Sequence, residues 1–152
     1  MESLRIESKD IYTIEVNDNG DTIEFDLVDV ELPFKCENAW AEVNKISKDL
    51  QAQLVIISKQ EDTKNGDRLL TKKEEMTIEA YRKAFREMRV AMDGFLGEGA
   101  CQKIFGDRNY LEMFSDLFEA LKPHLEKMEL TSHGIMDRIK AKYGKKDDDV
   151  LK

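Results

Sequence analysis

Apolar and polar residues alternate in two short segments near the start of the sequence, which predicts two β-strands. Between them lies Asn19-Gly20, a pair that favours a two-residue type I′ turn because both residues tolerate positive φ. With this turn, all the apolar side chains lie on one face of an antiparallel hairpin. The predicted cross-strand pairs are Val16 with Ile23, Ile14 with Phe25 and Tyr12 with Leu27.

After the hairpin the alternation changes phase, which predicts a bulge or a bend before Pro33. From about Cys36 the apolar spacing becomes three and four residues, which predicts helices. The first apolar stripe is Trp40, Val43, Ile46, Leu50, Leu54 and Ile57. A second helix is predicted to begin at Thr71, because Glu74 three residues later completes a capping box. Its apolar stripe is Ile78, Tyr81, Phe85, Met88, Met92 and Phe95.

Glycines at positions 94, 97 and 99 are predicted to break this second helix. A short segment, 100–105, follows and ends at Gly106. Asn109 is predicted to cap a further helix, which Pro123 stops or kinks. A last amphipathic stretch uses Leu125, Met128, Ile135, Met136, Ile139 and Tyr143.

These elements predict an α+β fold that is predominantly α-helical, with an N-terminal antiparallel β-hairpin followed by a bundle of about four to five helices. We expect a single domain over residues 1–143, with the hairpin region at 10–32 and the helical region at 36–143. A chain of 152 residues is long enough to bury a core of its own. Residues 144–152 are expected to be a disordered charged tail.

Composition narrows the classes of partner. Lys and Arg number 24 and Asp and Glu 32, so the net charge of −8 argues against nucleic-acid binding, which needs a basic surface. The longest apolar run, residues 54–57, is far shorter than the ~20 residues of a membrane helix. The start lacks the apolar stretch of a signal peptide, so a cytoplasmic location is expected. Cys36 and Cys101 are expected to be reduced, buried and inert.

We assign no catalytic, cofactor-binding or metal-binding residue from the sequence. The segment Gly94–Gly99 is a poor phosphate loop, because no strand precedes it and no Lys-Ser/Thr follows. The acidic turn of the hairpin lacks the flanking helices of a calcium loop. Glu15 and Glu24 face each other in the predicted register, and either a metal or splaying into water would relieve their repulsion. His124 and His133 are interpreted as structural or surface residues.

Two groups of side chains are candidate interaction surfaces. Arg82, Arg86 and Arg89 form a basic stripe, interpreted as a solvated helix face or as a site for an acidic partner. The second group is apolar and crowded into a short region, and any exposed part of it would be a partner-binding patch. Its members are Phe114, Leu117, Phe118, Leu121, Leu125 and Met128.

Three further features, spread over roughly residues 10–140, are informative together. They are the hairpin at 11–27, the helix start at residues 36–40 (Cys-Glu-Asn-Ala-Trp), and the junction at residues 92–106 (Met-Asp-Gly-Phe-Leu-Gly-Glu-Gly-Ala-Cys-Gln-Lys-Ile-Phe-Gly). With them, the chain as a whole resembles the tail-assembly chaperones of long-tailed phages (siphoviruses) and prophages of Gram-positive bacteria.

The resemblance implies a non-enzymatic protein of the host bacterial cytoplasm that acts in virion assembly. Such a protein binds and solubilises the tape-measure protein and helps to recruit the major tail-tube protein. Self-association and a longer frameshifted product are further properties that the resemblance implies. Helical grooves rimmed by charge can cover the apolar stripes of a helical partner reversibly, and net negative charge keeps such a complex soluble.

Two other classes of function remain open. One is a small dimeric helical adaptor or regulatory protein of phage or bacterial origin. The heptad-like spacing of residues 78–95 favours this interpretation. The other is an enzyme with an unrecognised pocket, which would need a concave site with convergent polar groups.

Overall fold

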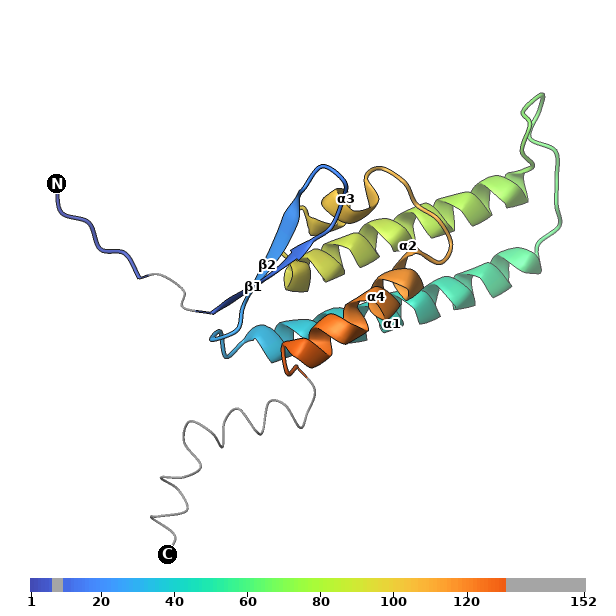
Figure 1. Cartoon of the computed structure of the whole chain (residues 1–152). Coiled ribbons are helices and arrows are strands. Elements are labelled where there is room, and N and C mark those ends of the chain that lie inside the picture. Colours follow the sequence, from blue (N-terminus) through green and yellow to red (C-terminus); the bar gives the residue numbers. More distant parts are fainter. Residues whose placement is uncertain (7–9, 131–152) are drawn as a thin grey trace, which may run out of the picture. The chain divides into compact units, whose positions relative to one another are not determined.

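The structure, a computed structural model, describes residues 1–6 and 10–130 and divides into two compact units. Among the described residues, unit 1 comprises residues 1–6, 10–12, 26–33 and 110–130, and unit 2 comprises residues 13–25 and 34–109. The elements are the strands β1 (Ile11–Glu15) and β2 (Thr22–Asp26) and the helices α1 (Leu32–Ser58), α2 (Lys72–Leu96), α3 (Ala100–Phe105) and α4 (Met113–Lys127) (Figure 1).

This order confirms the predicted fold class, because the described residues form an antiparallel hairpin followed by four helices. The expected single domain over residues 1–143 stays a prediction. The part of the last amphipathic stretch from Ile135 onward and the charged tail at 144–152 lie outside the described residues.

The hairpin has the predicted faces, but its register is shifted by two residues. The Val16 amide donates to the Asp21 carbonyl (2.9 Å), so these two residues form a pair and Ile14 lies opposite Ile23. The predicted pairing of Val16 with Ile23 is therefore wrong. A two-residue shift leaves every side chain on its original face, since faces alternate with a period of two. The inner face is thus preserved, with Ile23 and Phe25 buried on it.

Asn17 accounts for the different register. Its side-chain Oδ1 accepts hydrogen bonds from the amides of Asn19 (2.9 Å) and Asp21 (3.1 Å). These bonds close a four-residue loop, 17–20, in place of the predicted two-residue type I′ turn. Gly20 has a φ of +82°, whereas Asn19 keeps a negative φ.

The helices α1 and α2 lie side by side in unit 2 (Figure 1). The start of α2 meets the end of α1, where Lys73 Nζ donates to the Ser58 carbonyl (2.9 Å). The predicted capping box is confirmed, because Glu74 N donates to Thr71 Oγ1 (3.1 Å) and Thr71 N donates to Glu74 Oε1 (3.0 Å). The buried side chains that the sequence stripes predicted are Val43, Ile46, Leu50, Ile57, Phe85, Met88, Met92 and Phe95.

The start of α1 differs from the predicted one. Turns at residues 27–28 and 30–31 confirm the bend, and α1 begins at Leu32 rather than near Cys36. Pro33 is tolerated there because the N–H groups in the first turn of a helix have no acceptor within the helix, so no hydrogen bond is lost. Four members of the predicted apolar stripes are not buried: Trp40 is 50% exposed and Ile78 is 43% exposed, whereas Leu54 and Tyr81 are half-buried.

The junction between α2 and α3 is built on two glycines and one carboxylate. The predicted break is confirmed at Gly97 and Gly99 but is wrong at Gly94, because α2 continues through Gly94 and ends at Leu96, with Gly97 as its C-cap. Gly97 and Gly99 both have positive φ (+111° and +76°), so these two positions make the turn. Asp93 Oδ1 accepts a hydrogen bond from the Cys101 amide (2.9 Å), which fixes the first turn of α3 to α2.

Arg89 holds the segment after α3 against α2. Its guanidinium donates to the carbonyls of Gly106 (2.9 Å) and Arg108 (2.6 Å) and to Asn109 Oδ1 (3.1 Å). The guanidinium carbon, Cζ, also lies 5.7 Å from the centre of the Phe105 ring, which is a cation–π contact. Arg89 is therefore a structural residue, and the interpretation of it as part of a solvated stripe is wrong.

In unit 1, α4 differs from its prediction at both ends. It begins after Glu112 rather than at Asn109. The Asn109 side chain does not cap this helix, because its Oδ1 accepts a hydrogen bond from Arg89. The helix continues through Pro123 to Lys127, so the proline does not stop it. His124 Nδ1 is hydrogen-bonded to the Tyr12 hydroxyl (2.8 Å), which agrees with the structural interpretation of this histidine.

Candidate functional site

The six predicted partner-binding side chains on and after α4 have little exposed surface. Phe114, Leu117, Leu121 and Met128 are buried, and Phe118 and Leu125 are half-buried. Apolar side chains at these depths contribute mainly to the core. Their role in partner binding stays a prediction, and the exposed apolar surface must be sought elsewhere.

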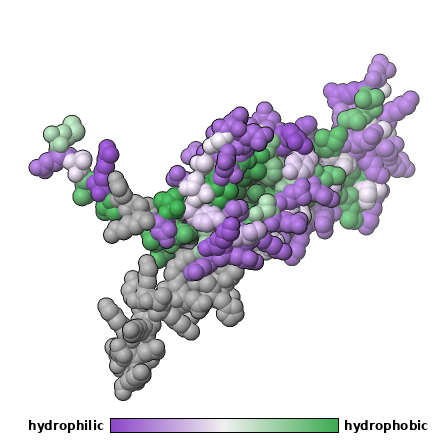
Figure 2. Space-filling model, viewed as in Figure 1, coloured by the Kyte–Doolittle hydropathy of each residue, from purple (hydrophilic) through white to green (hydrophobic). Residues whose placement is uncertain are grey.

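Exposed apolar side chains gather where α1 ends and α2 begins. We call this group the apolar tip; it consists of Val55 (53% exposed), Ile56 (61%), Leu69 (97%), Met76 (41%) and Ile78 (43%). Figure 2 shows apolar atoms among hydrophilic ones at this end of the two long helices. An ion pair between Arg68 and Glu75 (2.6 Å) lies beside them. Exposed large apolar side chains make this end of the helix pair a candidate interaction surface.

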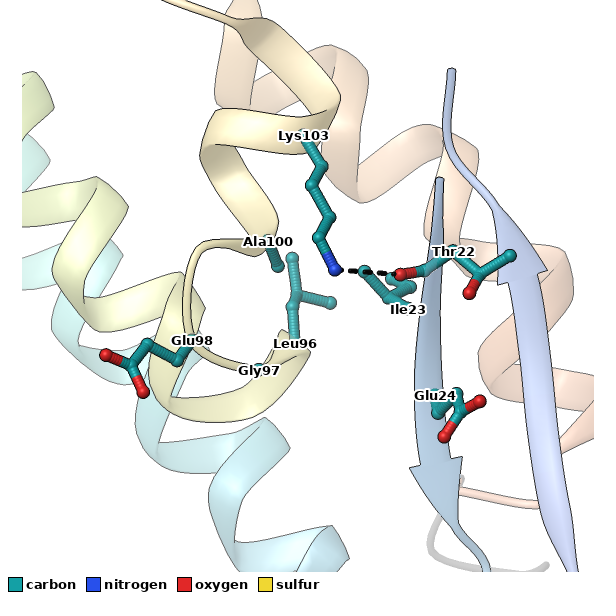
Figure 3. A pocket seen from close by; sticks show the side chains of 8 residues that line it. All are labelled: Thr22, Ile23, Glu24, Leu96, Gly97, Glu98, Ala100 and Lys103. Atoms are coloured by element: carbon teal, nitrogen blue, oxygen red, sulfur yellow. Dashed lines mark hydrogen bonds between the residues drawn. The ribbon is translucent and has the colours of Figure 1, made fainter. Parts of the chain in front are cut away.

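A second feature of unit 2 is an open groove of about 300 Å³ beside β2. Its polar lining comes from Thr22 and Glu24 of β2, Glu98 of the α2–α3 junction and Lys103 of α3 (Figure 3). Lys103 Nζ donates to the Thr22 carbonyl (3.2 Å), as the dashed line in Figure 3 marks. The Lys103 carbonyl in turn accepts a bond from Asn17 Nδ2 (2.9 Å), so α3 is joined to the hairpin by two hydrogen bonds.

Two residues that the sequence placed face to face are apart in the structure. In the observed register Glu15 lies opposite Thr22, and Glu24 lies opposite Thr13. The direct carboxylate pair that motivated a metal hypothesis is therefore absent from this hairpin. Over residues 1–6 and 10–130, no group of three or more His, Cys, Asp or Glu side chains is arranged to hold a metal ion. His133 lies outside these ranges.

The two cysteines are free thiols, and Cys101 is buried whereas Cys36 is half-buried. Burial is the main cause that raises the pKa of the Cys101 thiol to about 12. The hydrogen bond to Asp93 and the negative charge of Asp93 raise this pKa further, whereas the positive charge of Arg89 lowers it. Burial and the charge of Glu37 also raise the pKa of Cys36. Both shifts disfavour the reactive thiolate.

We therefore expect slow labelling of both cysteines in the folded chain. At pH 8 only about one Cys101 thiol in 10,000 is ionised, given its pKa of about 12. The folded chain should react with iodoacetamide at least about tenfold more slowly than the chain in guanidinium, where both thiols ionise normally. Because both pKa values are raised by folding, stability should decline as the pH rises above about 9. Equal labelling rates in the two states would contradict this assignment.

Sequence reasoning missed both features of unit 2. The apolar tip was not predicted because Ile78 fits a core spacing, and Val55 and Ile56 lie between two members of the first predicted stripe, Leu54 and Ile57. The clearest signal was Leu69, a large apolar residue in a polar connection. The groove depends on Lys103 meeting β2, a contact between residues 81 positions apart that no local pattern reports.

Comparison with known proteins adds one relationship. The model of the family DUF6673, described as a family of unknown function, matches residues 19–148. No curated protein and no solved structure matches the chain. In the described part of the chain, every helix is too short or too polar to span a membrane.

Proposed function

We propose that this chain, which belongs to the DUF6673 family of unknown function, is a non-enzymatic tail-assembly chaperone of a long-tailed phage or prophage. In this role it binds and solubilises the tape-measure protein in the host bacterial cytoplasm and helps to recruit the major tail-tube protein. The proposal starts from the resemblance of residues 10–140 to such chaperones, and the surface of unit 2 supports it.

The apolar tip is the observation that carries the proposal. A tape-measure protein is long and helical, with apolar stripes that aggregate until the tail tube encloses them. Its stripes need a cover that is itself apolar. The tip offers four large apolar side chains on α1 and α2, with Leu69 in the connection between these helices. The neighbouring Arg68–Glu75 pair supplies a polar rim, which is usual around an apolar binding surface. Such binding is reversible where each copy has only modest affinity and the cover is spread over many copies.

Co-expression with the tape-measure protein of the same genome tests this function. We expect the chain to raise the soluble fraction of the tape-measure protein and to purify with it. The double variant Ile56→Lys/Met76→Lys should reduce the co-purified amount by about tenfold, because two charges would replace exposed apolar contacts.

Val90→Lys is the matched control, because Val90 is also exposed (70%) and lies on α2 away from the tip. It should leave co-purification unchanged. Thermal unfolding by circular dichroism should show that all variants are folded. A wild-type chain that neither purifies with the tape-measure protein nor changes its solubility would reject the chaperone function.

A dimeric helical adaptor is the second candidate. The heptad-like spacing that motivated it consists mostly of side chains buried within the chain, namely Phe85, Met88, Met92 and Phe95. Only the first position, Ile78, is exposed enough to meet a second copy. Light scattering over a range of concentrations separates the two functions, because a fixed dimer with no dependence on concentration favours the adaptor.

A further inference from the structure

The net charge of this chain is concentrated around the hairpin. Of the 32 acidic residues, eight lie in residues 10–34, which contain no Lys or Arg, and the other 24 are balanced by the 24 Lys and Arg of the remaining sequence. Four of the eight belong to the hairpin segment of unit 2: Glu15, Asp18, Asp21 and Glu24. Such a one-signed region attracts basic groups.

The outer edge of β2 offers backbone groups to a ligand. Because Ile23 pairs with Ile14 of β1, the amide and carbonyl of Glu24 point away from β1. Neither group has a hydrogen-bond partner among the residues that the structure describes. The Thr22 carbonyl lies on the same edge and accepts the bond from Lys103, which shows that this edge faces the groove (Figure 3).

We propose that this groove binds an extended segment of a partner protein, antiparallel to β2, in which basic and apolar residues alternate. A residue opposite Glu24 in such a strand shares two backbone hydrogen bonds with it and places its side chain on the same face. A Lys or Arg at that position lies beside the Glu24 carboxylate. The side chains before and after it point to the other face, where Ile23 and Leu96 line the groove.

The free backbone groups select a strand over a helix. A helix uses its own amides and carbonyls internally, so it cannot satisfy the amide and carbonyl of Glu24. An extended segment has both groups to offer, as in other cases of strand addition to a sheet edge. Among extended segments, the acidic hairpin then favours those that carry basic side chains. This site is separate from the apolar tip and does not depend on the proposed chaperone function.

A synthetic peptide tests the proposal with the full-length chain. The probe is an eight-residue, fluorescently labelled peptide in which Lys alternates with Val, titrated with the chain and followed by anisotropy. In an antiparallel strand with Lys opposite Glu24, the Lys amides face β2 and the Val amides point away from it. Methylating the Lys amide nitrogens should weaken binding at least about tenfold, whereas methylating the Val amide nitrogens should change it less than about twofold.

Two charge-reversed chains form a matched pair for the same titration. Glu24→Lys should weaken binding of the unmethylated peptide at least about tenfold, and raising the salt should weaken binding to the wild-type chain. Glu61→Lys makes the same change at an exposed position in the loop between α1 and α2 and should have less than about a twofold effect. Circular dichroism checks that both variants are folded.

Three outcomes would overturn the proposal. Equal binding of the two methylated peptides would show attraction by charge alone. Equal weakening by Glu24→Lys and Glu61→Lys would place binding away from the groove. Absence of binding by the unmethylated peptide at low salt would remove the site altogether.

Discussion

Replacing Arg89 by methionine is expected to lower the free energy of unfolding by about 2–3 kcal/mol. The guanidinium donates to two carbonyls and one side-chain oxygen in the segment after α3, and methionine donates to none of them. The carbonyls of Gly106 and Arg108 would lose a charged donor, and hydrogen bonds to charged groups are worth more than neutral ones. Urea unfolding followed by circular dichroism measures the change.

Two further substitutions identify the cause. Arg86→Met removes an exposed charge from the same helix and should change the free energy of unfolding by less than about 0.5 kcal/mol. Arg89→Lys keeps the charge but loses the planar fork, so it should recover less than half of the loss. If Arg89→Lys were as stable as the wild type, charge rather than hydrogen-bond geometry would hold this segment.

Local patterns predicted the elements of this chain because those elements are determined by local physics. The Thr71–Glu74 capping box involves hydrogen bonds within one helical turn, so sequence alone was enough to find it. The hairpin faces followed from alternation, which a change of register by two residues does not disturb. The predicted stripe of α2 was right along its second half, where Phe85, Met88 and Met92 are buried.

The failures concern polar residues that bond to distant parts of the chain. Asn109 has the composition of a helix cap, but its amide oxygen accepts from Arg89, 20 residues away. Asn17 widens the hairpin loop while its amide nitrogen reaches the Lys103 carbonyl, 86 residues away. A rule that scores residues against their neighbours cannot weigh such bonds, because the competing partner becomes a neighbour only after folding.

The candidate surfaces were harder to predict than the fold for a similar reason. Apolar spacing predicts which side chains share a face of a helix, but it does not predict which faces pack against another element. Ile78 and Phe85 belong to the same predicted stripe, yet one is 43% exposed and the other 6%. The same difference separates the six apolar residues predicted for partner binding from the apolar tip. Both groups are apolar, but the six residues are buried or half-buried, whereas the tip is exposed.

Phe25→Ala is expected to be among the most damaging single substitutions in unit 2, with a loss of about 3–5 kcal/mol in the free energy of unfolding. Phe25 is 1% exposed, and its ring centre lies 5.1 Å from that of Phe95 on α2. Alanine would leave a cavity between β2 and α2 and remove one half of an aromatic pair. A two-stranded sheet has little stability of its own, so this contact matters more here than in a larger sheet.

Phe34→Ala is the matched control, since the same atoms are removed from a side chain that is 62% exposed, and its cost should stay below about 1 kcal/mol. Phe25→Leu should recover more than half of the stability lost in Phe25→Ala, because leucine refills most of the volume. Peptide binding at the β2 edge should weaken in Phe25→Ala even where the helices remain folded, since β2 would no longer be fixed beside Leu96. A Phe25→Ala chain with wild-type stability would mean that the hairpin contributes little to the core of unit 2.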